Sequence, residues 1–314
     1  MRALKLLHSK LFLLGERYIY SPSILWKLLA ILLLPLSILW ALGVIIKKSL
    51  NKKQTPPPLP TISIGNLTLG GSGKTPLCVA ISSNISGACI ILRGYKRKSK
   101  GLVVVAYNGK ILADINSSAD EAMLYARLVK NATVIVSEDR LQAIQKAKEL
   151  GARYALLDDG FGKFNIKKLD ILINPLYSPA LPFCLPSGGY RYPPSFIKYA
   201  DYVVQSGREF KSISYIKNSS KSMVLVSAIA NPARLSEFFG RTVGQVFFPD
   251  HYDFSKAELE EILAKFNATS LLVTQKDYVK ITHFGLCVSL IEQHTILCSD
   301  FVALLENFIS QEAL

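Results

Sequence analysis

The chain has 314 residues, half of them hydrophobic, and 37 Lys and Arg against 23 Asp and Glu give it a net charge of +14. Nine of the basic residues and one acid fall in residues 1–53, beside long apolar runs, which favours anionic membrane lipids as partners. No basic stripe interleaved with aromatic residues follows, so the sequence argues against nucleic acid, and it indicates no protein partner. The five cysteines include no C-x-x-C pair and the four histidines lack metal-ligand spacing, which argues against a structural zinc site.

The N-terminal region predicts a membrane anchor. Residues 28–46 contain no charge, and as a helix they span about 28 Å, close to the hydrocarbon thickness of a bilayer. A cleaved signal peptide would have a shorter apolar region, and a core helix would show a polar face, so we expect an uncleaved anchor. Residues 1–18 mix apolar and basic residues as an interfacial amphipathic helix does. Both flanks of the apolar run are basic, so the run fits a helix that crosses the bilayer and also one that lies partly within it.

Beyond the proline-rich stretch QTPPPLP (54–60), short apolar runs alternate with helical patterns. This alternation predicts βαβ units and a mainly parallel sheet. A second set of runs begins at residue 223, after NSSKS (218–222). We therefore expect an α/β protein in three parts: a membrane-anchoring helical segment at 1–53, a P-loop NTPase-like α/β/α lobe at 54–222, and a smaller α/β lobe at 223–314.

A glycine-rich stretch follows the first apolar run, TISIG, and precedes a predicted helix. In such a loop the backbone N–H groups turn toward phosphate oxygens, the lysine supplies charge and the next hydroxyl binds Mg²⁺. The common G-x-x-x-x-G-K-[ST] pattern is incomplete, since Thr68 stands where its first glycine belongs. A simple glycine turn is the alternative, but the strand–loop–helix context favours a nucleotide site. Its predicted residues are Gly70, Gly71, Ser72, Gly73, Lys74 and Thr75.

Acidic residues stand where a P-loop protein needs a metal partner. The run RYALLDDGF ends in Asp158 and Asp159, as a strand does when its carboxylates hold Mg²⁺ beside a nucleotide. A solvated turn is the alternative for this pair. Asp120 and Glu121 open a predicted helix, where the helix dipole alone would also favour acids.

Two further stretches carry ionisable groups of interest. His251 lies between Asp250 and Asp253 in FFPDHYDF, a setting suited to an acid–base histidine, although a lone histidine is more often structural. Arg93 opens the basic cluster in LRGYKRK, which follows an apolar run and suits phosphate or headgroup binding as well as simple solvation.

Together these stretches resemble the tetraacyldisaccharide 4′-kinase family. The matching stretches, in the family's order between residues 61 and 280, are IGNLTLGGSGKTP, LRGY, ADEA, LDDGF, LPSGGYR, FPDHYDF and TQKDYVK. The first glycine that this loop lacks is also absent from the family's pattern. Four departures accompany the match: Gly162 and Lys163 replace Gln-His, Tyr192 replaces a glutamate, Gly189 and Tyr190 replace Pro-Leu, and Ala119 replaces a glycine.

The resemblance implies transfer of the γ-phosphate of ATP, with Mg²⁺, to the 4′-hydroxyl of tetraacyldisaccharide 1-phosphate in lipid A biosynthesis. It implies a bacterial inner-membrane protein whose catalytic part faces the cytoplasm, with the second lobe closing over the active site. By position it assigns catalysis to Asp120, His251 and Lys74, metal binding to Thr75, Glu121, Asp158 and Asp159, and substrate contact to Arg93 and Arg191.

Two other kinds of protein fit part of this pattern. A membrane-anchored P-loop ATPase or GTPase is one, but a GTPase should carry N-K-x-D, and VTQKD (273–277) lacks the spacer. A nucleotide-gated membrane scaffold is the other, and it would not need an acid–histidine pair.

Overall fold

The computed structural model describes residues 14–69, 73–175, 177–229, 232–249 and 252–313. Its internal contacts divide the chain into a larger unit, Arg17–Ser212 with Thr295–Leu314, and a smaller unit that includes Ile213–His294. The boundaries fall within β9 (Phe210–Lys217) and β13 (Val288–Leu297), so the first lies a few residues before the predicted join at 218–222.

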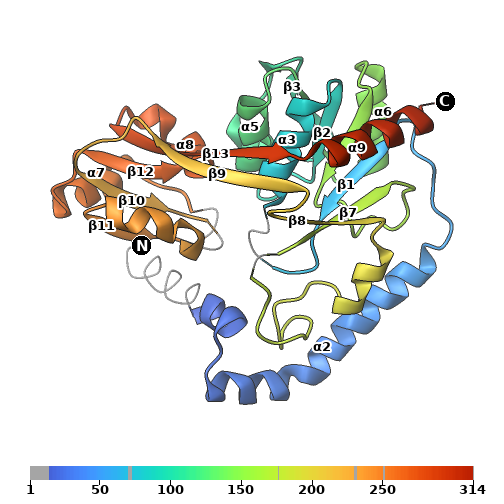
Figure 1. Cartoon of the computed structure of the whole chain (residues 1–314), viewed down its shortest axis with the longest axis horizontal. Helices are drawn as coiled ribbons and strands as arrows, with labels where there is room; N and C mark the ends of the chain where they lie inside the picture. The colour runs from blue at the N-terminus through green and yellow to red at the C-terminus, as the bar shows by residue number, and fades with distance from the viewer. Residues whose placement is uncertain (1–13, 70–72, 176, 230–231, 250–251, 314) are drawn as a thin grey trace. The chain divides into compact units, whose positions relative to one another are not determined.

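The larger unit is built on an eight-stranded sheet with the order β4-β3-β5-β2-β6-β1-β7-β8 (Figure 1). Its strands are β1 Thr61–Gly65, β2 Ala88–Leu92, β3 Val103–Tyr107, β4 Lys110–Ile111, β5 Thr133–Val136, β6 Tyr154–Asp158, β7 Leu169–Asn174 and β8 Tyr202–Gln205. Neighbours from β5 to β8 are parallel, whereas β3 is antiparallel to both β4 and β5. The strands β1, β2, β5 and β6 are buried along their whole length, as the centre of a parallel sheet is. The predicted parallel α/β organisation is confirmed.

Side chains of the central strands alternate between two cores. Ile62, Ile64 and Ile90 pack in the core that also contains residues of α3 (Lys74–Asn84), α5 (Asp120–Leu128) and α9 (Ser299–Glu312). Ile91 packs in the opposite core with α6 (Arg140–Glu149). The larger unit therefore has the predicted α/β/α layers, and the short α4 (Ile115–Ser118) and the 3-10 helix η1 (Pro194–Tyr199) lie in its connections.

The C-terminal helix α9 differs from the predicted domain organisation. Residues 223–314 were expected to form one lobe, but Phe301, Leu305 and Ile309 of α9 lie in the core of the larger unit. They recur every four residues and so form one apolar stripe. An ion pair between Arg153 Nη2 and Glu306 Oε2, at 2.5 Å, flanks this stripe. The compact second unit therefore ends near residue 294, and the helix after it returns to the first.

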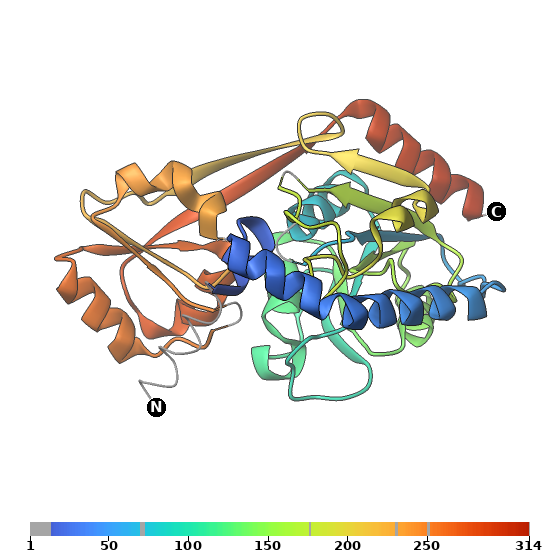
Figure 2. The same ribbon diagram turned by 90° about the horizontal axis from the view of Figure 1, so that it is seen from below.

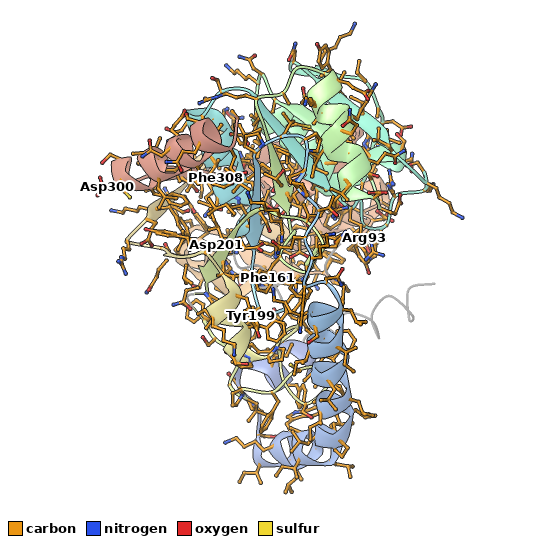
Figure 3. All side chains as sticks on the ribbon, turned by 90° about the vertical axis from the view of Figure 1, so that its right-hand side faces the viewer. Arg93, Phe161, Tyr199, Asp201, Asp300 and Phe308 are labelled. Atoms are coloured by element: carbon orange, nitrogen blue, oxygen red, sulfur yellow. The ribbon has the colours of Figure 1, made fainter. Side chains whose placement is uncertain are left out.

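Helix α2 (Ile24–Leu50) contains the whole predicted apolar run, with Pro35 inside it. An 18-residue window of this helix has a mean hydropathy of 2.7 and is 11% buried, so by length and composition it is able to cross a membrane. Only a narrow stripe, which includes the buried Ala30 and Ser37, faces the protein, and leucines and isoleucines elsewhere on the helix are exposed. Figures 2 and 3 show α2 running beside the connection between β7 and β8.

The smaller unit contains a second sheet with the order β11-β10-β12-β13-β9. Its other strands are β10 Met223–Ser227, β11 Gly244–Phe247 and β12 Ser270–Thr274, and its helices are α7 Lys256–Lys265 and α8 Gln275–Ile281 with the 3-10 helices η2 Pro232–Arg241 and η3 Thr282–Phe284. Strand β10 is parallel to β11 and β12, and β12 is parallel to β13. The predicted second α/β lobe is present.

Candidate active site

The phosphate loop joins β1 to α3. Gly73 has φ 90°, a left-handed conformation that glycine adopts without strain, and α3 begins at the next residue, Lys74. The Nζ atom of Lys74 donates a hydrogen bond to Asn66 Oδ1 at 2.9 Å, and Asn66 directly follows β1. The predicted residues Gly70, Gly71 and Ser72 lie outside the described residues. The described ends of the loop have the strand–loop–helix geometry that the sequence predicts.

The paired aspartates end the neighbouring strand β6. Ile64 of β1 is in register with Asp158, and the Asp159 N–H donates to the Ile64 carbonyl at 2.9 Å. Carboxyl ends of adjacent parallel strands share one edge of a sheet, so this register brings Asp159 Oδ1 within 3.6 Å of Lys74 Nζ. The phosphate-loop cation and the strand-end acid, separated by more than 80 residues in the sequence, therefore form one site.

Arg191 joins the same site from the connection between β7 and β8. Its guanidinium donates to both carboxylate oxygens of Asp159, at 2.7 and 2.8 Å, and to Asn66 Oδ1 at 2.5 Å. Desolvation opposes ionisation of Asp159, but the hydrogen bonds and charge of Arg191, with the charge of Lys74, hold the pKa of this carboxyl well below its usual range. Asp159 is therefore a carboxylate at neutral pH.

Asp158 lies in a different environment from its neighbour. Its side chain is buried, and Tyr125 of α5 donates its hydroxyl to Asp158 Oδ2 at 2.9 Å. Burial, and then repulsion from Glu121, raise the pKa of Asp158 well above its ordinary value despite the nearby Lys74. The Thr75 side chain also acts on the Tyr125 hydroxyl, so two of the predicted metal-binding residues, Thr75 and Asp158, lie beside this tyrosine.

Mg²⁺ fits this arrangement by the chemistry of its donors. Asp158 Oδ1 is buried and has no hydrogen-bond partner among the described residues, and a buried carboxylate oxygen needs a donor or a cation. Hydroxyl and carboxylate oxygens, which Thr75, Glu121 and Asp158 supply, are ligands of Mg²⁺. In the described part of the chain no group of three or more His, Cys, Asp and Glu side chains is close enough to hold a metal by itself. In P-loop proteins phosphate oxygens and water complete the coordination of the ion.

The predicted acid–base residues are placed only in part. Asp120 and Glu121 lie in the first turn of α5. The same helix carries Tyr125, which bonds Asp158, so both acids lie on the helix that contacts Asp158. Ala119 precedes this helix with φ 71° and ψ 161°, a backbone conformation that strongly favours glycine. His251 lies outside the described residues, so its distance from Asp120 is not part of this geometry.

A cluster of cations lies at the same edge of the sheet. Arg93 follows β2, the buried Arg140 begins α6 after β5, and Lys163 follows β6. Burial lowers the pKa of Lys163, and repulsion from Arg140, Lys47 and Arg93 lowers it further. Burial also lowers the pKa of Arg140 to about 10, and its Nε has no partner among the described residues. Close cations that repel one another form a binding site for an anion.

Two of the departures from the family pattern contact each other. A Cβ atom added at Gly162 would lie 2.2 Å from the Tyr192 hydroxyl oxygen, so glycine at 162 leaves room for tyrosine at 192. The Tyr192 ring packs edge-on to Phe161, with ring centroids 5.3 Å apart, and the Arg191 guanidinium lies 5.9 Å from its centroid. Tyrosine at 192 therefore depends on glycine at 162, and the two departures are structurally linked.

Sequence reasoning missed three residues of this site. Asn66 lies in the family stretch IGNLTLGGSGKTP, where its side chain accepts from both Lys74 and Arg191. Tyr125 stands four residues after Glu121 and so on the same helix face, a signal that could have been used. Arg140 follows the helix-capping Asp139, which accepts from the Leu141 and Gln142 N–H groups, and nothing local distinguishes it from a surface arginine.

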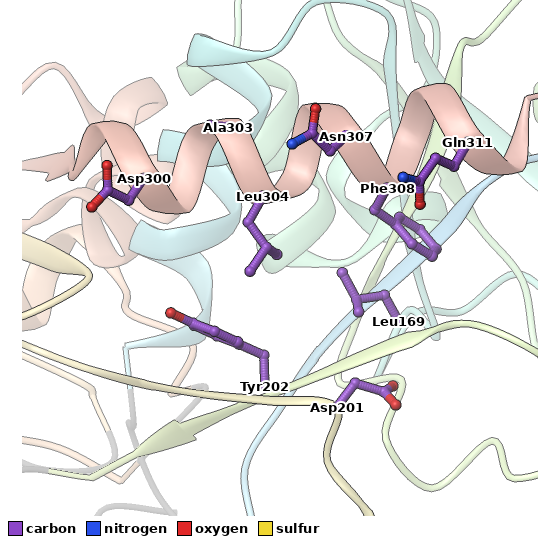
Figure 4. Close-up of a pocket in the computed structure, with 9 residues that line it drawn as sticks. All are labelled: Leu169, Asp201, Tyr202, Asp300, Ala303, Leu304, Asn307, Phe308 and Gln311. Atoms are coloured by element: carbon purple, nitrogen blue, oxygen red, sulfur yellow. The ribbon is translucent and has the colours of Figure 1, made fainter.

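A surface hollow of about 550 Å³ lies elsewhere on the larger unit (Figure 4). It is bordered by α9 and by the starts of β7 and β8, with Asp201, Tyr202 and Phe308 among its lining residues. None of the predicted site residues lines it. The described residues of the predicted site lie instead at the carboxyl edge of the sheet, where parallel α/β sheets place their ligands.

A phosphate loop at the end of one strand, a carboxylate pair at the end of the next and converging cations define a P-loop phosphotransferase. The model of one family, described as tetraacyldisaccharide-1-P 4′-kinase, matches residues 29–223 and 210–307. The chain belongs to this family, and the predicted family and kinase class are confirmed.

Related sequences and a solved structure show the same relationship. Tetraacyldisaccharide 4′-kinases from Campylobacter jejuni, Aliarcobacter butzleri and Helicobacter pylori are 46%, 44% and 41% identical to the chain. These similarities cover 94%, 88% and 94% of this chain and 96%, 90% and 94% of those proteins. A crystal structure of the Aquifex aeolicus protein in complex with ATP has a TM-score of 0.73 at 26% identity, covering 91% of this chain and all of that one.

Proposed function

We propose that this chain transfers the γ-phosphate of ATP to the 4′-hydroxyl of tetraacyldisaccharide 1-phosphate, a step of lipid A biosynthesis. The observation that carries the proposal is the convergence of Lys74, Asp159 and Arg191 at the end of β1, beside the buried Asp158. Membership of the kinase family and the ATP complex of the similar Aquifex aeolicus protein support it. The predicted ATP site is thus the loop from Gly70 to Thr75.

Phosphoryl transfer depends mainly on positioning and on neutralising charge. Lys74 supplies a positive charge at the phosphate loop, and Arg191 holds Asp159 ionised next to it. Thr75, Glu121, Asp158 and Asp159 would hold Mg²⁺, which supplies further positive charge to the phosphate oxygens when bound. Tyr125 fixes the Asp158 carboxylate by a hydrogen bond and leaves its other oxygen for the ion.

The acceptor needs a base and a binding site for its own phosphate. A sugar hydroxyl is a poor nucleophile, and Asp120 with His251 would accept its proton. The cluster of Arg93, Arg140 and Lys163 suits the 1-phosphate, because three cations that repel one another gain most from a bound dianion. Arg191 and Lys74 are further cations at this edge of the sheet.

The membrane assignment rests on α2. Its length, hydropathy and exposed apolar surface favour anchoring in the bacterial inner membrane, with membrane lipids around the helix and the catalytic units in the cytoplasm. ATP is made in the cytoplasm and the acceptor is held in a bilayer by its acyl chains, so an enzyme that uses both must work at that surface. Lys47 and Lys48 at the end of α2 suit anionic headgroups.

The direct test is a phosphorylation assay with the purified full-length chain, labelled ATP, Mg²⁺ and tetraacyldisaccharide 1-phosphate in mixed micelles. We expect labelled 4′-phosphate product, and Asp120→Ala and His251→Ala should each lower kcat by about 10²–10⁴-fold. Asp300→Asn and His294→Ala change an exposed acid and an exposed histidine and serve as matched controls with normal kcat.

The alternatives give different outcomes in the same assay. ATP hydrolysis without lipid product would indicate a membrane-anchored ATPase, and ATP binding without turnover would indicate a nucleotide-gated scaffold. Either result contradicts the kinase proposal. Normal turnover in both Asp120→Ala and His251→Ala would contradict only the roles given to these residues.

A further inference from the structure

The connection between β7 and β8 is hydrogen-bonded to the residues that precede the phosphate loop. The Arg191 N–H donates to the Leu67 carbonyl at 2.8 Å, and the Leu69 N–H donates to the Gly189 carbonyl at 2.8 Å. Tyr190 and Thr68 form an antiparallel bridge between these two bonds. We call residues 184–192 the bridging segment. Because Leu69 is directly followed by the loop, this segment acts as a short strand that fixes where the phosphate loop begins.

The opposite side of the bridging segment is bonded to the apolar helix α2. Ser37 Oγ donates to the Cys184 carbonyl at 2.8 Å and accepts from the Ser187 N–H at 2.8 Å. One turn further along the helix, Trp40 Nε1 donates to the Arg191 carbonyl at 2.9 Å. All of these residues belong to the larger unit. The bridging segment therefore has the apolar helix on one side and the start of the phosphate loop on the other.

Arg191 connects the two sides with the catalytic charges. The Trp40 N–H donates to the backbone carbonyl of Arg191, while the Arg191 guanidinium donates to both Asp159 oxygens and to Asn66 Oδ1. Asn66 in turn accepts from Lys74. A displacement of the Arg191 backbone would therefore move its guanidinium relative to Asp159. It would also disturb Asn66, and through Asn66 the position of Lys74.

Polar groups on the rest of α2 are few, which makes these contacts notable. Ser37 is 3% exposed on a helix whose other faces are mainly exposed leucine and isoleucine. A hydroxyl or an indole N–H on a helix within a bilayer has no water to bond, so it needs a partner in the protein. Trp40 is 48% exposed, with its ring on the outer surface and its N–H bonded inward.

We propose that Trp40 and Ser37 are positioning residues, through which the membrane-facing helix α2 holds Arg191 and the start of the phosphate loop in the geometry that binds ATP. The inference rests on the proposed function for the identity of the nucleotide. It makes α2 a part of the nucleotide site as well as an anchor. Seating of α2 in lipid and affinity for ATP are then coupled.

The first test is spectroscopic and uses the two tryptophans of the chain, Trp26 and Trp40. Trp26→Phe leaves Trp40 as the sole indole in the full-length protein. We expect Mg²⁺–ATP, added without lipid acceptor, to change the intensity of Trp40 emission with the same Kd that calorimetry gives. The change should be lost when Arg191→Lys is added, because lysine cannot reproduce the two parallel hydrogen bonds to Asp159.

The second test is a double-mutant cycle. Trp40→Phe keeps a ring and removes the N–H, and we expect the KM for ATP to rise about 3- to 10-fold, the range for one hydrogen bond. Its thermal unfolding midpoint and its KM for the lipid should stay unchanged. In the Arg191→Lys background the same substitution should change the KM for ATP by less than about twofold. Trp26→Phe, the same chemical change on the same helix, is the matched control.

The outcomes separate the inference from the function on which it rests. If ATP binds by calorimetry while Trp40 emission stays constant, or if Trp40→Phe raises the KM equally in both backgrounds, the positioning role is wrong and the kinase proposal stands. If wild-type protein makes no lipid product, the kinase proposal fails, and the emission and binding measurements still report on the coupling between α2 and the nucleotide site.

Discussion

Two adjacent carboxylates at the end of β6 occupy opposite environments. The side chain of Asp158 is buried, and it lies near Glu121 and accepts a hydrogen bond from the Tyr125 hydroxyl, both on α5. Asp159 has φ 56° and turns outward to Arg191 and Lys74, with 46% of its side chain exposed. Both acids are proposed ligands of Mg²⁺, but Asp158 keeps a buried oxygen without a partner among the described residues, whereas Lys74 and Arg191 already balance the charge of Asp159. Neighbours in sequence acquire different chemistry because the turn after β6 points them at different elements.

The largest expected effect comes from neutralising the buried acid. Asp158→Asn removes a proposed ligand of Mg²⁺ and should lower kcat by about 10²–10³-fold, the scale for losing a transition-state charge contact. In metal-free protein at neutral pH the free energy of unfolding should rise rather than fall, because the raised pKa shows that the folded state disfavours the charge. Kinetics and chemical denaturation measure the two effects. A large loss of stability with normal kcat would show that Asp158 is structural.

Neutralising the outward acid should have a different signature. Asp159→Asn leaves one acceptor oxygen for Arg191 at residue 159 and removes the opposite charge. We therefore expect the KM for ATP to rise about tenfold and stability to fall by about 1 kcal/mol, a modest value because the pair is partly exposed. Steady-state kinetics at varied ATP measure the first effect and urea denaturation the second. Identical kinetic profiles for Asp158→Asn and Asp159→Asn would remove the distinction between the two carboxylates.

Removing the Tyr125 hydroxyl tests the support of the buried acid. Tyr125→Phe leaves Asp158 Oδ2 buried without its donor, which should cost about 1–3 kcal/mol of stability and lower kcat several-fold by loosening the carboxylate. The buried Tyr154 donates to the Ile85 carbonyl, away from the site, so Tyr154→Phe is a matched control that affects stability alone. An effect of Tyr125→Phe on stability without any effect on kcat would contradict the positioning of Asp158.

The pH dependence of stability should also separate the two acids in metal-free protein. The folded pKa of Asp158 is raised, so between pH 4 and about 7 the folded state binds more protons than the unfolded state, and stability falls as pH rises. The folded pKa of Asp159 is lowered, so its contribution is present above the ordinary Asp value and is lost as pH falls below about 4. We expect the free energy of unfolding to depend on pH differently in wild type and in Asp158→Asn when it is measured across pH 3–8. Between pH 4 and about 7 the two slopes should differ by up to about 1.4 kcal/mol per pH unit. Parallel curves would contradict the raised pKa.

The smallest expected effect lies at the start of α5. Ala119 adopts φ 71° and ψ 161°, so Ala119→Gly should relieve backbone strain and raise stability by about 1 kcal/mol, after the entropy that glycine adds to the unfolded chain. The exposed Ala303 of α9 has helical backbone, so Ala303→Gly should instead lower stability by about 1 kcal/mol. Differential scanning calorimetry of both variants checks the opposite signs.

The sequence by itself determined the features that depend on neighbours along the chain. The apolar run of α2, the alternation of strands and helices, the phosphate loop before Lys74 and the acids after β6 follow from hydrophobic period, glycine placement and charge, and the ordered motifs identified the family. Each of these is a local pattern, so a single sequence carries it.

Only the tertiary structure decided which of these elements meet. Arg191 reaches Asp159 and Asn66 because the bridging segment pairs with Leu67–Leu69, and Tyr125 reaches Asp158 because α5 packs against β5 and α3. The apolar stripe of α9 suited either core, and packing placed it in the larger unit. Hydrophobic burial is not directional, so an apolar stripe predicts that a helix packs against a core but does not predict which core. The chain path through the two sheets supplied that partner.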